Sequence, residues 1–90
     1  MYLMEKKTYY KVKLKCSPYR NYPDEYYDIS VMNAVLAKNN AKIIKTAKKD
    51  IYYICTAIIE ESLFSQTIIE LNQKIHRGVV LLSSHKSYFH

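Results

Sequence analysis

Segment 51–59, IYYICTAII, restricts the fold most, because it is a long β-favouring run that is apolar on both faces. Alternate residues of a strand point to opposite sides, so the odd-numbered residues from Ile51 to Ile59 share one face. The even-numbered residues share the other face, which only Thr56 interrupts within this run. A strand of this kind lies inside a sheet with something covering each side. We therefore expect segment 51–59 to be a central strand.

Three further strands are expected around it. Residues 8–16 alternate between apolar and lysine side chains, which is typical of a half-buried strand. Residues 42–46 precede segment 51–59 and form a hairpin with it through a turn at 47–50. Residues 79–83 form the last strand, with an extension to residue 86 left open. Residues 1–7 and 87–90 are expected to be a lead-in and a tail that flank a single domain.

Two helices are expected between the strands. The first begins at Asp28, whose side chain can accept a backbone N–H as the N-cap. It ends at Asn39 and Asn40, because Asn tolerates the left-handed conformation found there. The second spans residues 62–76, with Gly78 expected at its C′ position. The apolar residues expected to face the core repeat at helical spacing: Val31, Met32, Val35 and Leu36, then Phe64, Ile68, Leu71 and Ile75.

The predicted order is strand, helix, strand, strand, helix, strand. Right-handed crossovers arrange this order as a ferredoxin-like α+β plait, a four-stranded antiparallel sheet with two helices on one face. The expected strand order is 4-1-3-2. Taking the first and third strands as parallel neighbours, we expect Lys6 and Lys7 to lie beside Lys48 and Lys49. The phase of the third strand, and therefore which of Tyr52 and Tyr53 is exposed, is left open.

The net charge is +6, and all but two of the 14 basic residues are lysines. A basic surface favours an anionic partner, most often nucleic acid. Lysine acts as a mobile point charge that suits phosphates, whereas arginine reads bases in bidentate geometry. The alternative is that a modest positive charge only keeps a small protein soluble.

The candidate binding residues come from a lysine row on the first strand, a tyrosine-rich loop and the lysine turn. The row lies on the sheet face away from the helices, where lysines with interleaved aromatics suit phosphate contact and base stacking. The loop spans residues 17–27, and its rings could instead pack over the end of the core. The candidates are Tyr9, Lys11, Lys13, Lys15, Tyr19, Arg20, Tyr22, Lys48, Lys49 and Tyr53.

The sequence shows no catalytic or metal-binding constellation. The histidines lack metal-ligand spacing, and the single glycine of the chain excludes a glycine-rich phosphate loop. Cys16 and Cys55 are expected to be reduced and buried, as small apolar residues. We therefore expect no catalytic residue, no metal, no cofactor and no enzymatic activity. No stretch approaches the ~20 apolar residues of a membrane span, and we expect a cytoplasmic protein without a membrane partner.

Two functions remain open. The first is a small non-enzymatic protein that binds or inhibits a partner protein, for example a host nucleic-acid-handling complex, or that forms a homodimer. It would use the sheet face or the tyrosine-rich loop, since Tyr is enriched at interfaces. The small size and the abundance of Ile, Lys, Asn and Tyr favour a virus or mobile element, which would place it in the host cytoplasm. The alternative is a nucleic-acid-binding domain that contacts the DNA or RNA backbone through its lysines and tyrosines.

Overall fold

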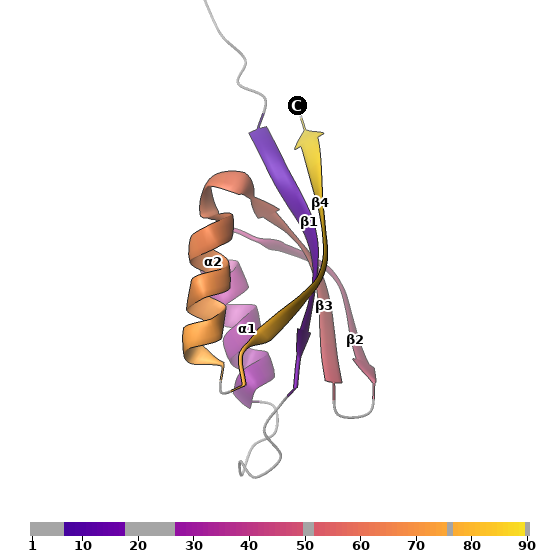
Figure 1. Ribbon diagram of the computed structural model, residues 1–90, viewed down its shortest axis with the longest axis vertical. Coiled ribbons are helices and arrows are strands. Elements are labelled where there is room, and N and C mark those ends of the chain that lie inside the picture. Colours follow the sequence, from indigo (N-terminus) through magenta and orange to yellow (C-terminus); the bar gives the residue numbers. More distant parts are fainter. Residues whose placement is uncertain (1–6, 18–26, 50–51, 76, 90) are drawn as a thin grey trace, which may run out of the picture.

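The computed structural model describes residues 7–17, 27–49, 52–75 and 77–89, which form one sheet and two helices (Figure 1). The elements are β1 (Lys7–Cys16), α1 (Tyr27–Lys38), β2 (Lys42–Lys49), β3 (Tyr52–Glu60), α2 (Glu61–Lys74) and β4 (Val79–Phe89). The strands form an antiparallel sheet in the order β2-β3-β1-β4, and both helices lie on one side of it (Figure 1). This is the ferredoxin-like plait that the sequence predicts.

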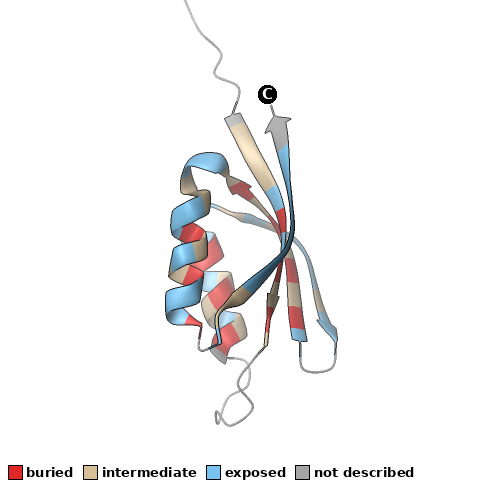
Figure 2. Cartoon of the chain, viewed as in Figure 1, coloured by how far each residue is buried: buried red, intermediate tan, exposed pale blue. Residues whose placement is uncertain are grey.

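The core lies between the helices and one face of the two central strands (Figure 2). Every second residue of β3 from Tyr53 to Ile59 is buried there, as are Val12, Leu14 and Cys16 of β1. The strand order confirms the expected central position of β3. The buried apolar residues are Val12, Leu14, Cys16, Met32, Val35, Leu36, Tyr53, Cys55, Ala57, Ile59, Leu71 and Ile75. Phe64 and Ile68 pack partly buried against this cluster, so the predicted stripe of the second helix faces the core.

Helix α1 ends as expected but begins one residue early. Asn40 has a φ of 58°, and the Ala41 N–H donates to the Leu36 carbonyl oxygen at 2.8 Å. These features define a Schellman-type end that Asn accommodates. At the other end, the helix begins at Tyr27, so Asp28 lies in the first turn and is buried, not at the expected N-cap. A carboxylate in the first turn still complements the helix dipole.

Gly78 has a different role from the expected helix C′. Helix α2 ends at Lys74, and Gly78 lies in the following turn with a φ of +72°. Its N–H donates to the Ile75 carbonyl oxygen at 2.9 Å. A Cβ atom at this position would lie 2.5 Å from the Asn72 Oδ1 atom, which itself accepts the Val79 N–H at 3.0 Å. The turn into β4 therefore requires glycine for conformation and for space.

The expected parallel arrangement of the first and third strands is wrong. β1 and β3 are antiparallel, with Cys16 opposite Tyr53 and Tyr9 opposite Glu60. The crossover through α1 makes β1 and β2 parallel, and the hairpin then reverses β3 relative to both. Lys7 therefore lies opposite Phe89 of β4, away from the hairpin end that carries Lys48 and Lys49. Lys6 lies outside the described residues.

Two strands are longer than expected. β2 continues to Lys49 and so includes residues that we assigned to the turn. β4 continues to Phe89, so residues 87–89 are not a tail but pair with Tyr9, Thr8 and Lys7 of β1. Each edge strand also has an irregularity in its register: β2 at Ile43–Lys45 and β4 where it passes Lys13 and Leu14 of β1.

Candidate functional site

The sheet face opposite the helices, here called the open face, carries five of the ten candidate residues. Val12 and Leu14 are buried beneath the helices, so the alternating residues of β1 point to the open face. These residues are Tyr9, Lys11, Lys13 and Lys15, as predicted. β2 contributes lysines that lie opposite open-face residues of β3. The combined set, named the lysine face, is Lys11, Lys13, Lys15, Lys42, Lys45 and Lys49.

Lysines of the two strands flank β3 on both sides. Lys13 of β1 and Lys45 of β2 both pair with Thr56, which lies between them. Lys11 and Lys42 flank Ile58 in the same way. Neighbouring strands are about 4.8 Å apart, so the backbones of each lysine pair are separated by roughly 10 Å. The site therefore has two cationic borders with an uncharged floor between them.

Two shallow hollows occupy this floor. One has a volume of about 180 Å³ and is lined by Lys13, Lys45, Lys49 and Ile54, among others. The neighbouring hollow, of about 340 Å³, shares Lys13, Lys45 and Thr56 with the first and extends to His85 of β4. The two hollows thus follow the line between the lysine borders, and a ligand lying there would meet ammonium groups from both sides.

An aromatic ring lies at the hairpin end of the lysine face. The Nζ atom of Lys15 lies 4.5 Å from the centroid of the Tyr52 ring, a cation–π contact. Tyr52 is 37 % exposed. Its neighbour Tyr53 is only 8 % exposed. The Tyr53 hydroxyl donates a hydrogen bond of 3.4 Å to the Oδ1 atom of Asn33, which lies on α1. The list of candidates from the sequence contained Tyr53 and not Tyr52. In the structure Tyr52 takes its place on the open face, because the phase of β3 turns Tyr53 toward the helices.

The remaining candidates divide into three groups. Lys49 pairs with Tyr52 and belongs to the open face, whereas Lys48 pairs with Tyr53 on the helix side of the sheet, although it is exposed. Tyr19, Arg20 and Tyr22 lie outside the described residues.

The signal that could have identified Tyr52 is the small size of Cys55 and Ala57, since small residues in phase with Tyr53 leave room for helices to pack.

Negative charge is scarce on the open face. Glu60, opposite Tyr9 at the far end from the hairpin, is its only acidic residue in the described parts of the chain. Glu61 and Glu70 lie on α2, where Glu61 forms an ion pair with Lys86 at 3.3 Å. The lysine face is therefore a region of positive potential that an anionic ligand would stabilise.

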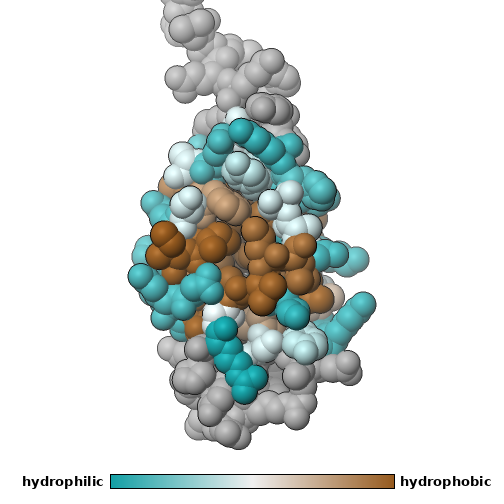
Figure 3. All heavy atoms as spheres, viewed as in Figure 1, coloured by the Kyte–Doolittle hydropathy of each residue, from teal (hydrophilic) through white to brown (hydrophobic). Residues whose placement is uncertain are grey.

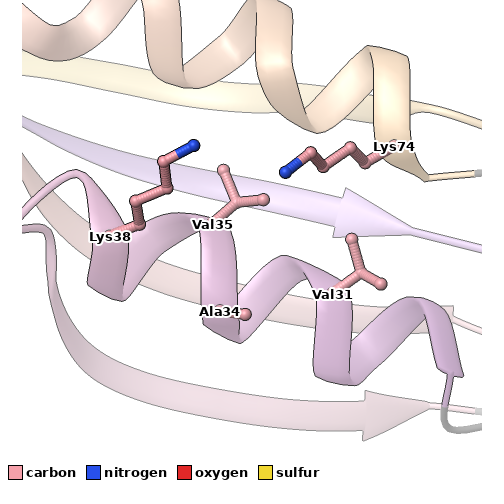
Figure 4. Close-up of a pocket in the computed structure, with 5 residues that line it drawn as sticks. All are labelled: Val31, Ala34, Val35, Lys38 and Lys74. Carbon is pink, nitrogen blue, oxygen red and sulfur yellow. The ribbon is translucent and has the colours of Figure 1, made fainter.

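A groove between the helices is a second concave region (Figure 4). It has a volume of about 530 Å³, and its walls include Val31, Val35, Lys38 and Lys74. Both lysine Nζ atoms point toward each other in Figure 4, because each lies 2.9 Å from the same Oε2 atom of Glu70. Glu70 thus balances one of the two positive charges of the groove, which makes the groove a weaker candidate than the lysine face.

Glu70 ties the two helices together. Besides the two lysines, the Nδ2 group of Asn39 donates to its Oε1 atom at 3.2 Å. Hydrogen bonds from Lys74, Lys38 and Asn39 lower the pKa of the Glu70 carboxyl to about 2. Gln66 in turn donates to Asn39 Oδ1 at 2.8 Å. This network links the end of α1 to the middle of α2, which indicates a structural role.

Both cysteine thiols lie in the core. Cys16 and Cys55 are free thiols buried on the helix side of the sheet. Burial raises the pKa of both to about 11, and the charge of Asp28 adds to the effect at Cys16. The described residues contain no group of three or more His, Cys, Asp or Glu side chains that could hold a metal ion. Neither described helix is long and apolar enough to cross a membrane.

No protein-family model matches the chain, and no curated protein matches its sequence. Among solved structures, the chain is similar to the solution structure of the C-terminal domain of the MgtC protein from Mycobacterium tuberculosis. The two are 14 % identical with a TM-score of 0.46, and the match covers 99 % of this chain and 94 % of that one. The strand order and helix placement described above define the fold independently of this match.

Proposed function

We propose that the chain binds a single strand of DNA or RNA along its lysine face, mainly through the phosphate backbone. The observation that supports this most directly is the pair of lysine borders on either side of β3. A single strand laid along β3 would place phosphates within reach of Lys13 and Lys45 at once. Each phosphate neutralised by a lysine releases counterions, which supplies sequence-independent affinity.

The rest of the open face supports the same ligand. Tyr52, which is exposed, lies at one end of the lysine borders, and Tyr9, which is half-buried, lies toward the other. Accessible aromatic rings offer stacking platforms to unpaired bases. The lysine face contains no arginine, and lysine does not give bidentate contacts to guanine. The proposed binding is therefore strongly salt-dependent and weakly selective for sequence.

The test is a titration of fluorescently labelled oligothymidylate with the chain at several salt concentrations, followed by anisotropy. Affinity should fall linearly with salt on logarithmic axes. In Lys11→Gln/Lys13→Gln the magnitude of this slope should fall by about 1.4, since each lost phosphate contact on a single strand removes about 0.7. Repeating the titration with duplex DNA and with RNA of the same length defines the preferred ligand.

The matched control is Lys74→Gln/Lys86→Gln. It removes the same two charges from the helix side of the sheet, where these lysines bind Glu70 and Glu61. The control should keep the wild-type slope. Equal losses in the two double variants would mean that only net charge matters, and no binding of the wild type at low salt would exclude the proposal.

A partner protein is the second candidate, and the open face has one feature that favours it. Ile44 is exposed, and Ile54 and Ile58 are only partly buried, so apolar side chains lie among the lysines. An acidic protein surface with an apolar centre would fit such a face. A viral or mobile-element source would make a host nucleic-acid-handling complex in the cytoplasm a suitable partner. Capture of a protein from nuclease-treated extract by the wild type, but not by Ile44→Lys, would support this candidate.

A further inference from the structure

The two edges of the sheet have opposite chemistry. The β2 edge carries exposed lysines at four of its eight positions, Lys42, Lys45, Lys48 and Lys49. The β4 edge begins with residues 79–85, VVLLSSH, which contain no Lys, Arg, Asp or Glu. Lysines on an edge strand discourage pairing with another chain. The first part of β4 lacks these lysines, although its register against β1 shifts near Leu82, and within the described chain β4 pairs only with β1.

The uncharged edge continues into an apolar surface. Val80, Leu81 and Leu82 of β4 are exposed, and so is Ile69 of α2. Figure 3 shows apolar residues gathered in the middle of the face that α2 and β4 present together. We call these four residues the β4–α2 patch. A contiguous exposed patch next to an unpaired strand edge marks a protein interaction surface.

We propose that the β4–α2 patch binds a second copy of this chain, with the two β4 strands paired antiparallel about a two-fold axis near residues 81–83. Self-pairing is electrostatically permitted here, because residues 79–85 of one copy would face the same uncharged residues of the other. Pairing of two β2 edges would instead bring the lysines of both copies together. Pairing of β4 with β2 is heterologous and would extend into a filament, whereas the two-fold arrangement closes.

The proposed dimer has a defined geometry. A two-fold axis perpendicular to the sheet joins the two sheets into one of eight strands with both open faces on the same side. The two β1 lysine rows would then be separated by three strand spacings, about 14 Å. On the other side, the α2 helices would approach each other near Ile69. The inference does not depend on the proposed nucleic-acid binding, although the dimer would carry two lysine faces on one side.

The first test is the mass of the chain in solution, measured by sedimentation equilibrium over micromolar to millimolar concentrations. The wild type should reach twice the monomer mass of 10.7 kDa. Leu82→Lys should remain monomeric because it places two like charges near the axis. The matched control is Ile44→Lys, a similar change on the other edge, since Leu82 is 44 % and Ile44 is 49 % exposed. The control should dimerise like the wild type.

A second test remains valid even if Leu82→Lys fails to fold. Ser83→Cys places a thiol near the proposed axis, and Ile44→Cys places one on the β2 edge at a position without a cysteine opposite it. Cys16 and Cys55 are buried, so they should not compete under mild oxidation. Ser83→Cys should form a covalent dimer rapidly and Ile44→Cys should not. A monomeric wild type at all concentrations, filaments, loss of the dimer only in Ile44→Lys, or equal cross-linking at both positions would each overturn the proposal.

Discussion

The two faces of the sheet are formed by the same strands but differ in the interactions that their side chains make. On the helix side, Val12, Leu14, Cys55 and Ala57 are completely buried. On the open face, the residues between them are lysines on β1 and a mixture of Ile, Thr and Tyr on β3. Removal of apolar area from water stabilises the first face, whereas like charges crowd the second. Neighbouring residues of one strand therefore have different roles: one side chain contributes to the stability of the core, and the next belongs to the candidate binding surface.

The largest effect that sharpens this comparison is expected from adjacent substitutions on β1. Leu14→Ala should lower the free energy of unfolding by about 2–5 kcal/mol, because it leaves a cavity in a fully buried site. Lys13→Ala should change it by less than about 0.5 kcal/mol, since the side chain is exposed. Urea unfolding monitored by circular dichroism measures both values. Similar losses in the two variants would contradict the division between the faces.

Thiol reactivity provides the next contrast. At pH 8, a pKa of about 11 leaves Cys16 and Cys55 with roughly a hundredfold less thiolate than an exposed cysteine. The native chain should therefore react slowly with a chromogenic disulfide reagent. Lys13→Cys, on the open face, should add one thiol that reacts at once, and denaturant should make all thiols fast. Fast reaction of the native wild type would show that the helix side is not sealed.

The Glu70 network between the two helices should make the free energy of unfolding depend on pH in the acid range. The lowered pKa of Glu70 means that its carboxylate is stabilised in the folded state, so protonation favours the unfolded chain. This contribution is complete above the ordinary carboxyl pKa of about 4.3 and is lost as the pH falls through about 2. Glu70→Gln should therefore be less stable than the wild type at pH 7. The gap should narrow progressively in acid.

Unfolding curves of the two chains between pH 2 and pH 7 measure this effect. Glu61→Gln is the control on the same helix, because Glu61 forms an exposed ion pair with Lys86. It should leave the pH profile almost unchanged. A constant gap between Glu70→Gln and the wild type at every pH would argue against the carboxylate as the stabilising group.

The smallest effect is expected from the aromatic contact on the open face. Tyr52→Leu removes the ring beneath the Lys15 ammonium while retaining an apolar side chain. An exposed cation–π contact contributes about 0.5–1 kcal/mol, so the free energy of unfolding should fall by no more than that. Phe at the same position should restore it, because the ring is kept. A loss as large as that of Leu14→Ala would place Tyr52 in the core.

Much of the fold could be predicted because its signals are local. The alternation in residues 8–16 separates Lys13 from Leu14, and β1 has this pattern in the structure. The asparagines at 39–40 mark the end of α1, where Asn40 adopts the left-handed conformation. The lysine row of the candidate site follows from the same alternation. By contrast, its second border on β2 was not predicted, because it depends on which residues of β2 lie opposite β3.

The sequence by itself determined the element order, the lysine row and the core-facing residues of β1 and of the two helices, since each depends on periodicity within one segment. Only the tertiary structure decided that β3 runs antiparallel to β1 and that Tyr53 packs beneath the helices while Tyr52 faces out. It also decided that residues 87–89 pair with β1. Strand direction, phase and register arise from contacts between segments far apart in the chain, and a single strand carries no record of its partner's position.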